Sequence, residues 1–152
     1  RGPYIIKDYN PEKPKKGVVI VRGTSSTNSL VQILPRIKEE GPNVKIVASI
    51  SWELFQRQTE DYRESIMTDS EWHDAMIITN GARRLMHKWI ANRVVEEYSM
   101  APDHDNRWRT GGSLDQIVAE SKLDPDSLWE GINKFAEDRD ERLSQLRSSI
   151  PN

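Results

Sequence analysis

The chain has 152 residues, about the length of one domain, and carries a net charge of −2 from 22 basic and 24 acidic residues. It contains no cysteine, which excludes disulfides, thiolate metal sites and a cysteine nucleophile. No basic patch marks a nucleic-acid partner, and no apolar run approaches the roughly 20 residues of a membrane span, so we expect a cytoplasmic protein that binds neither nucleic acid nor membrane.

The first quarter of the chain predicts two strands joined by a linker. Residues 4–9 are typical of a short strand, and residues 10–16 form a charged linker that contains proline. The β-branched run 18–21, closed by Gly23, predicts a central strand. We therefore divide the chain into an amino-terminal strand and linker, 1–16, and an α/β domain, 17–152. Because position 1 is Arg, we expect the domain to be a fragment of a longer chain.

A helix is predicted after this strand. The hydroxyls of residues 24–27 can cap its start, and residues 41–42, Gly-Pro, end it. Pro35 lies inside the helix and predicts a kink, because it removes one backbone hydrogen bond. The apolar residues at the spacing of one helix face are Leu30, Ile33, Leu34 and Ile37.

The middle of the chain predicts two further core strands, 44–50 and 74–79. Between them, Ser51 can cap a short helix over 52–55. Thr59 or Asp61 can open another helix around 62–67.

The next segments predict a helix over 82–92, a fifth strand over 94–100, and a loop without periodicity over 101–112. A capping box at 113–116 begins another helix. The last strong helix start is at 123–125, where Asp124 is the cap, Pro125 is the first helical residue and Leu123 can pack on Leu128. Its apolar face is Leu128, Ile132 and Phe135, and the same phase resumes at Leu143, Leu146 and Ile150.

The alternation of strands and helices predicts an α/β fold with a mostly parallel sheet covered on both faces. Residues 51–55, Ser-Trp-Glu-Leu-Phe, are followed by Gln56, Gln58 and then Tyr-Arg-Glu-Ser-Ile at 62–66. This pattern resembles the carboxy-terminal domain of the transketolase family. Residues 2–8, 17–30 and 113–135 are similar to other parts of that domain, whereas 68–112 depart from it.

The resemblance implies a three-layer αβα, Rossmann-like fold with a mostly parallel five-stranded sheet. It implies a parent enzyme that uses thiamine diphosphate and Mg²⁺ to transfer two-carbon ketol units between sugar phosphates. In that family the cofactor lies on the preceding domains, so the expected partners are those upstream domains and a second copy in a homodimer. The family's Gly-Asp-Gly cofactor motif has no counterpart here, so we expect this domain to be inactive alone and to hold no cofactor.

Two groups of polar residues are candidate sites. Asp103, His104 and Asp105 share one loop, but no metal-binding spacing follows, and the nearby arginines compete for the carboxylates, so we predict no metal site. Thr24, Ser25 and Ser26 follow a strand and open a helix, where α/β proteins bind anions. They form a possible anion site, and a stand-alone nucleotide- or anion-binding regulatory module is the alternative function.

No catalytic residue is predicted. Neither Ser25 nor Ser26 lies in a Gly-x-Ser-x-Gly turn, and neither His73 nor His87 has a signature around it. The chain has five tryptophans, a residue that favours protein interfaces. We therefore predict an interface role, with the interface residues Trp52, Trp108, Leu143, Leu146 and Ile150.

Overall fold

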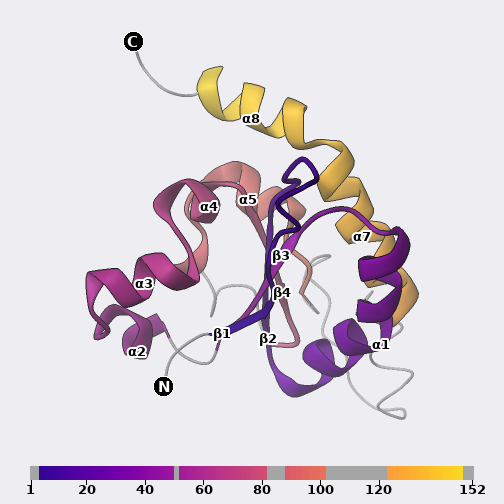
Figure 1. Cartoon of the computed structure of the whole chain (residues 1–152), viewed down its shortest axis with the longest axis horizontal. Coiled ribbons are helices and arrows are strands. Elements are labelled where there is room, and N and C mark those ends of the chain that lie inside the picture. The colour runs from indigo at the N-terminus through magenta and orange to yellow at the C-terminus, as the bar shows by residue number, and fades with distance from the viewer. Residues whose placement is uncertain (1–3, 50–51, 82–87, 102–122, 149–152) are drawn as a thin grey trace.

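The computed structural model describes residues 4–49, 52–81, 88–101 and 123–148, which form three layers (Figure 1). A sheet lies in the middle. Helices α1 (Thr24–Glu40) and α7 (Pro125–Glu137) cover one face, and the short helices α2 (Trp52–Gln56), α3 (Glu60–Ile66) and α4 (Asp69–His73) cover the other. The predicted three-layer α/β class is confirmed. Within the described ranges, no helix has the length and apolarity needed to span a membrane.

The sheet has the strand order β1-β3-β2-β4. The central strand β2 (Val18–Arg22) runs parallel to both β3 (Lys45–Ala48) and β4 (Ala75–Thr79), and the edge strand β1 (Tyr4–Lys7) runs antiparallel to β3. The described residues thus form four strands rather than the five predicted. At the position expected for the fifth, Met100 makes only an isolated parallel bridge to Ile78.

The predicted strand over 94–100 is wrong, because this segment forms helix α5 (Arg93–Tyr98). The side chain of Asn92 accepts a hydrogen bond from the backbone N–H of Val95 at 2.9 Å and starts the helix. The two adjacent valines suggested a strand, but only Val95 is buried. Of the helix predicted over 82–92, residues 82–87 lie outside the described residues, and Asn92 belongs to the cap of α5 instead.

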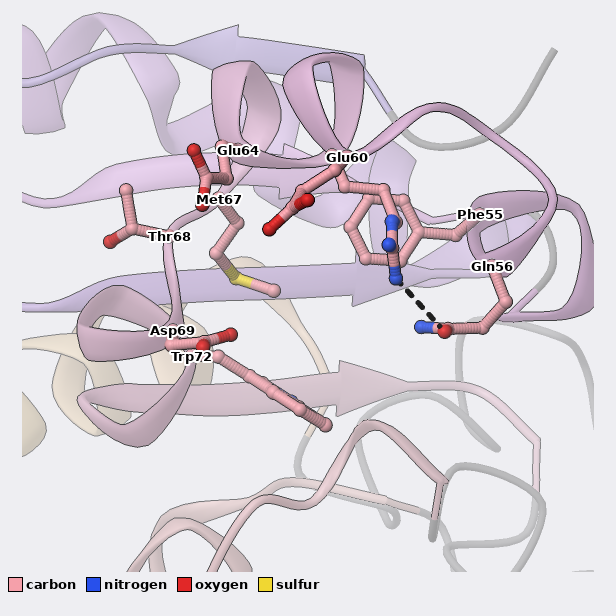
Figure 2. A pocket seen from close by; sticks show the side chains of 9 residues that line it. Phe55, Gln56, Glu60, Glu64, Met67, Thr68, Asp69 and Trp72 are labelled. Atoms are coloured by element: carbon pink, nitrogen blue, oxygen red, sulfur yellow. Dashed lines mark hydrogen bonds between the residues drawn. The ribbon is translucent and has the colours of Figure 1, made fainter.

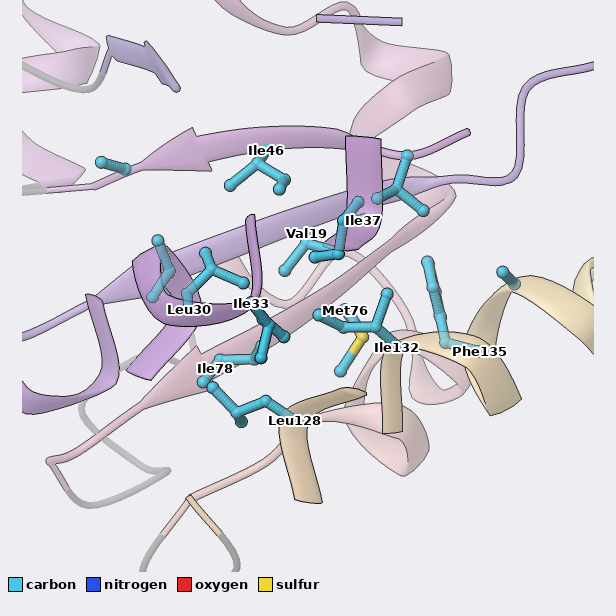
Figure 3. Packing of buried hydrophobic residues seen from close by; sticks show 14 of the residues in the cluster. Val19, Leu30, Ile33, Ile37, Ile46, Met76, Ile78, Leu128, Ile132 and Phe135 are labelled. Carbon is cyan, nitrogen blue, oxygen red and sulfur yellow. The ribbon is translucent and has the colours of Figure 1, made fainter. Parts of the chain in front are cut away.

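Alternate residues of the central strands point to opposite faces, which gives two hydrophobic clusters. Under the short helices, the strand residues Val18, Ile20 and Ile77 belong to one cluster with Phe55 and Met67. The side chains of Phe55 and Met67 are labelled in Figure 2. The opposite cluster is drawn in Figure 3 and packs the sheet against α1 and α7; its labelled members are Val19, Leu30, Ile33, Ile37, Ile46, Met76, Ile78, Leu128, Ile132 and Phe135. The apolar faces predicted for both long helices are confirmed.

The caps of the helices follow the prediction in part. Thr59 caps α3 and Asp124 caps α7 through side-chain hydrogen bonds, as expected. Helix α1 is different: its cap is Gly23, at a φ of 100°, and no side chain caps it, so the predicted hydroxyl caps at 24–27 are wrong. A Cβ at Gly23 would lie 1.6 Å from the Oδ1 atom of Asn80, which explains the glycine. The helix then runs through Pro35 to Glu40.

A buried ion pair joins the last helix, α8 (Arg139–Ser148), to the sheet. Asp74, just before β4, accepts hydrogen bonds from Arg142 Nη1 at 2.7 Å and from Arg139 Nε at 2.8 Å. Arg142 is 3% exposed, and it also donates to the carbonyl oxygens of Phe135 at 2.9 Å and Lys16 at 3.1 Å. Burial lowers the pKa of Arg142, and Asp74 opposes that shift, so the guanidinium keeps its charge.

Next to this ion pair, Tyr98 connects α5 to the junction of α7 and α8. Its hydroxyl donates to Asp138 Oδ2 at 2.7 Å. Burial and this hydrogen bond raise the pKa of Tyr98 to about 12. The same bond, followed by the contact with Lys134, lowers the pKa of Asp138.

Replacing Arg142 tests how much the buried ion pair contributes. We expect Arg142→Met to lower the free energy of unfolding by about 3 kcal/mol or more, because Asp74 stays buried with one partner fewer. The exposed Arg147→Met on the same helix is the control and should change it by less than about 0.5 kcal/mol. Urea unfolding of both variants measures the difference, and equal losses would contradict a special role for Arg142.

Alkaline pH tests the environment of Tyr98. Because its pKa is raised above the unfolded value of about 10, its contribution to stability is complete below about pH 10 and is lost as the pH rises towards 12. Tyr98→Phe should therefore flatten the fall in unfolding free energy over this range. The control is Tyr4→Phe, because Tyr4 is an exposed residue. A fall as steep in Tyr98→Phe as in the wild type would contradict the assignment.

Candidate functional site

The segment 52–72 forms a surface hollow of about 320 Å³ between the short helices (Figure 2). Phe55, Met67 and Trp72 supply its apolar surface. Glu60, Glu64 and Asp69 place carboxylates around it. The remaining lining residues are Gln56, Arg63 and Thr68.

Local sequence signals position the two helices that face each other across the hollow. Thr59 accepts a hydrogen bond from the backbone N–H of Tyr62 at 3.2 Å and starts α3. Thr68 and Glu71 form a capping box that starts α4, a helix that our sequence analysis did not predict. The Thr-x-x-Glu spacing at 68–71 was the available signal. Glu71 also pairs with the buried Lys45 at 3.2 Å, which fastens α4 to β3.

Trp89 supports the hollow from within the domain. Its ring stacks on Phe55 with 5.3 Å between centroids, and its carbonyl oxygen accepts a hydrogen bond from Trp72 Nε1. On the other face of the sheet, the guanidinium of Arg36 lies 3.9 Å from the ring centroid of Trp129. Trp72, Trp89 and Trp129 therefore make contacts within the domain itself. The high tryptophan content is thus weaker support for a protein interface than the sequence alone suggested.

The charged lining of the hollow is mostly acidic. Arg63 donates to Gln56 Oε1 at 3.1 Å, so the one guanidinium is partly engaged while three carboxylates line the same surface. The described lining residues include no histidine, serine or lysine, and Thr68 is the one hydroxyl side chain among them. Across the described ranges, no group of three or more His, Asp or Glu side chains could hold a metal ion.

A second hollow, of about 450 Å³, lies at the carboxyl ends of β2 and β3. Of the three residues of the predicted anion site, Thr24 lines it, whereas Ser26 is fully buried and Ser25 is half-buried. Ser49 also lines the hollow and was not predicted. Its place after the last residue of β3 was the available signal, because ligands of α/β sheets bind at strand carboxyl ends.

The predicted interface residues are described only in part. Leu143 and Leu146 are half-buried on α8, which extends beyond the sheet in Figure 1. Trp108 and Ile150 lie outside the described residues, as does the side chain of Trp52. The predicted metal-free loop with Asp103, His104 and Asp105 lies outside them too, as does His87. His73 is exposed and lies 3.3 Å from the Asn92 amide.

The sequence is similar to known proteins over much of its length. The family described as transketolase-like TK C-terminal domain matches residues 2–100. The chloroplastic transketolase of Solanum tuberosum is 31% identical over 70 residues, which are 46% of this chain and 9% of that protein. The chloroplastic transketolase of Zea mays is 35% identical over 69 residues, and transketolase 2 of Escherichia coli (strain K12) is 31% identical over 67; each match covers 44% of this chain and 10% of the relative.

Solved structures show the same fold. Transketolase of Pichia stipitis in complex with sedoheptulose-7-phosphate superposes with a TM-score of 0.66 at 16% identity, over 90% of this chain and 18% of that chain. Transketolase of Leishmania mexicana superposes with a TM-score of 0.61 at 17% identity, over 91% and 18%. The matched part thus spans about a tenth of the curated relatives and under a fifth of the solved chains.

Proposed function

Because the chain belongs to the family of transketolase-like TK C-terminal domains, we propose that it is the carboxy-terminal structural and interface domain of a thiamine-diphosphate-dependent transketolase-like enzyme. The parent enzyme transfers two-carbon ketol units between sugar phosphates and acts as a cytoplasmic homodimer. The single observation that carries the proposal is the family match over residues 2–100, which includes the helices α2 to α4. The stand-alone regulatory module is not favoured, since the relatives named above are all transketolases.

In this proposal the cofactors belong to other domains. The similarity to transketolases implies thiamine diphosphate and Mg²⁺ in the parent enzyme. We place them on the thiamine-binding domains that precede this one in the same polypeptide, and the carboxylates of the hollow in Figure 2, which would repel a diphosphate, support this placement. The role of this chain is to position those domains and the second subunit.

The proposed contact surface centres on the helices α2 to α4. Leu54 is one of the few large apolar side chains that are exposed, at 39%, and it precedes Phe55 at the edge of the hollow. The hollow can accept apolar or cationic side chains from the upstream domains, because it combines aromatic rings with carboxylates. The predicted interface residues Leu143 and Leu146 on α8 are proposed as a further contact. Trp52, Trp108 and Ile150 remain predictions from the sequence.

The isolated chain tests the division of roles. We expect no ketol transfer, and we expect calorimetry with Mg²⁺ to show thiamine diphosphate binding no more tightly than inorganic pyrophosphate. Pyrophosphate is the control, because it reports any binding that the diphosphate alone provides. Low-micromolar binding that requires the thiamine moiety would contradict the assignment.

The full-length parent tests the contact surface. Leu54→Asp should at least halve ketol-transfer activity or the dimer fraction measured by light scattering, because a carboxylate would be buried without a partner at the contact. The control is Val31→Asp on α1, where an equally apolar side chain is 50% exposed on the opposite layer. Equal effects of the two variants would place the contact elsewhere.

A further inference from the structure

The second hollow lies where the chain path favours a ligand site. From β2 the chain passes to α1 on one face of the sheet, and from the adjacent parallel strand β3 it passes to α2 on the other face. The two connections therefore separate at the strand ends. In open α/β sheets such a point leaves a crevice at the carboxyl edge, and ligands bind there. The hollow of about 450 Å³ occupies this crevice.

The amino end of α1 faces this edge with its backbone N–H groups uncapped by side chains. Helix α1 has 17 residues, no capping side chain and no acidic residue in its first turn. The backbone N–H of Thr27 donates to Gly23 O, so the amides before it begin the helix without an intrahelical acceptor. Such an end carries a partial positive charge and favours an anion.

Ser49 gives an independent indication of a ligand. It is 5% exposed, lines the hollow, and its Oγ has no hydrogen-bond partner among the described residues. Its backbone N–H donates to Val21 O at 2.9 Å, which holds the residue beside the end of β2. A buried hydroxyl without a partner costs free energy, so a native example calls for an explanation such as a bound ligand.

The charged and polar residues that line the hollow favour an anionic ligand. Arg22, Thr24 and Thr27 line it with a guanidinium and two hydroxyls. None of its described lining residues is acidic, in contrast to the hollow of Figure 2. A helix end, a serine and an arginine thus supply donors to one hollow, which suits the tetrahedral oxygens of a phosphate.

We propose that the carboxyl edge of β2 and β3 is a binding site for a small phosphate-bearing anion, held by the first amides of α1, the Ser49 hydroxyl and Arg22. Its lining residues are different from those of the hollow in Figure 2. It stands on the geometry of this edge and does not depend on the proposed function.

Titration of the ¹⁵N-labelled chain with inorganic phosphate, against chloride at equal ionic strength, tests the site. We expect saturable shifts of the backbone amides of residues 23–26. Thr24→Asp places a carboxylate in the first turn, where it favours the helix and repels phosphate, and should weaken binding at least 10-fold. Ser144→Asp, an exposed position on α8, adds the same charge elsewhere and should bind as the wild type does.

Ser49→Ala provides a second test, because it removes the hydroxyl without adding charge. We expect this variant to bind phosphate at least threefold more weakly. Its backbone amide spectrum should still be that of a folded protein. The proposal is overturned if phosphate causes no saturable shifts, or if Thr24→Asp binds phosphate as tightly as Ser144→Asp. These titrations contain no thiamine diphosphate and no upstream domain. A negative result would therefore overturn the phosphate site but not the proposed role of the chain in the parent enzyme.

Discussion

The buried pairing of Arg142 with Asp74 fixes the amino edge of the sheet, and the rest of the structure is arranged around it. Asp74 precedes β4, and Lys16, whose carbonyl oxygen also accepts from Arg142, precedes β2. The same guanidinium bonds to the end of α7 at Phe135 and lies 3.6 Å from that ring's centroid. One side chain thus joins two strands and two helices. Since a buried charge without its partners is costly, these elements hold one arrangement.

The two faces of the sheet and its carboxyl edge differ in how the described residues cover them. One face of the sheet is covered by the long helices α1 and α7, whose apolar faces are largely buried (Figures 1 and 3). Over the other face the described helices α2 to α4 are short, and they leave the hollow of Figure 2. Leu54 on α2 is exposed. The carboxyl edge carries the second hollow. We propose the first surface for contact with protein and the carboxyl edge for binding a small anion.

The parts of this arrangement that depend on local periodicity were predictable. The strand 18–21, the apolar faces of α1 and α7 and the caps at Thr59 and Asp124 follow from short-range patterns. Tertiary contacts decided the rest. Arg142 lies in a run of charged residues, a pattern typical of a solvent-exposed segment. It is nevertheless buried, because it pairs with Asp74, which is 68 residues away in the sequence. The hollow at 55–72 likewise requires the stacking of Phe55 on Trp89, which sequence spacing does not reveal.

Hydrogen exchange tests most directly the central claim that the helices α2 to α4 form the contact surface. The backbone amides of residues 52–72 and of α1 should be compared between the isolated chain and the full-length parent enzyme. Short helices that cover only part of a surface exchange readily unless another surface packs on them. We expect at least 10-fold slower exchange of 52–72 in the parent enzyme, with little change in α1. Equal exchange of 52–72 in both proteins would contradict it.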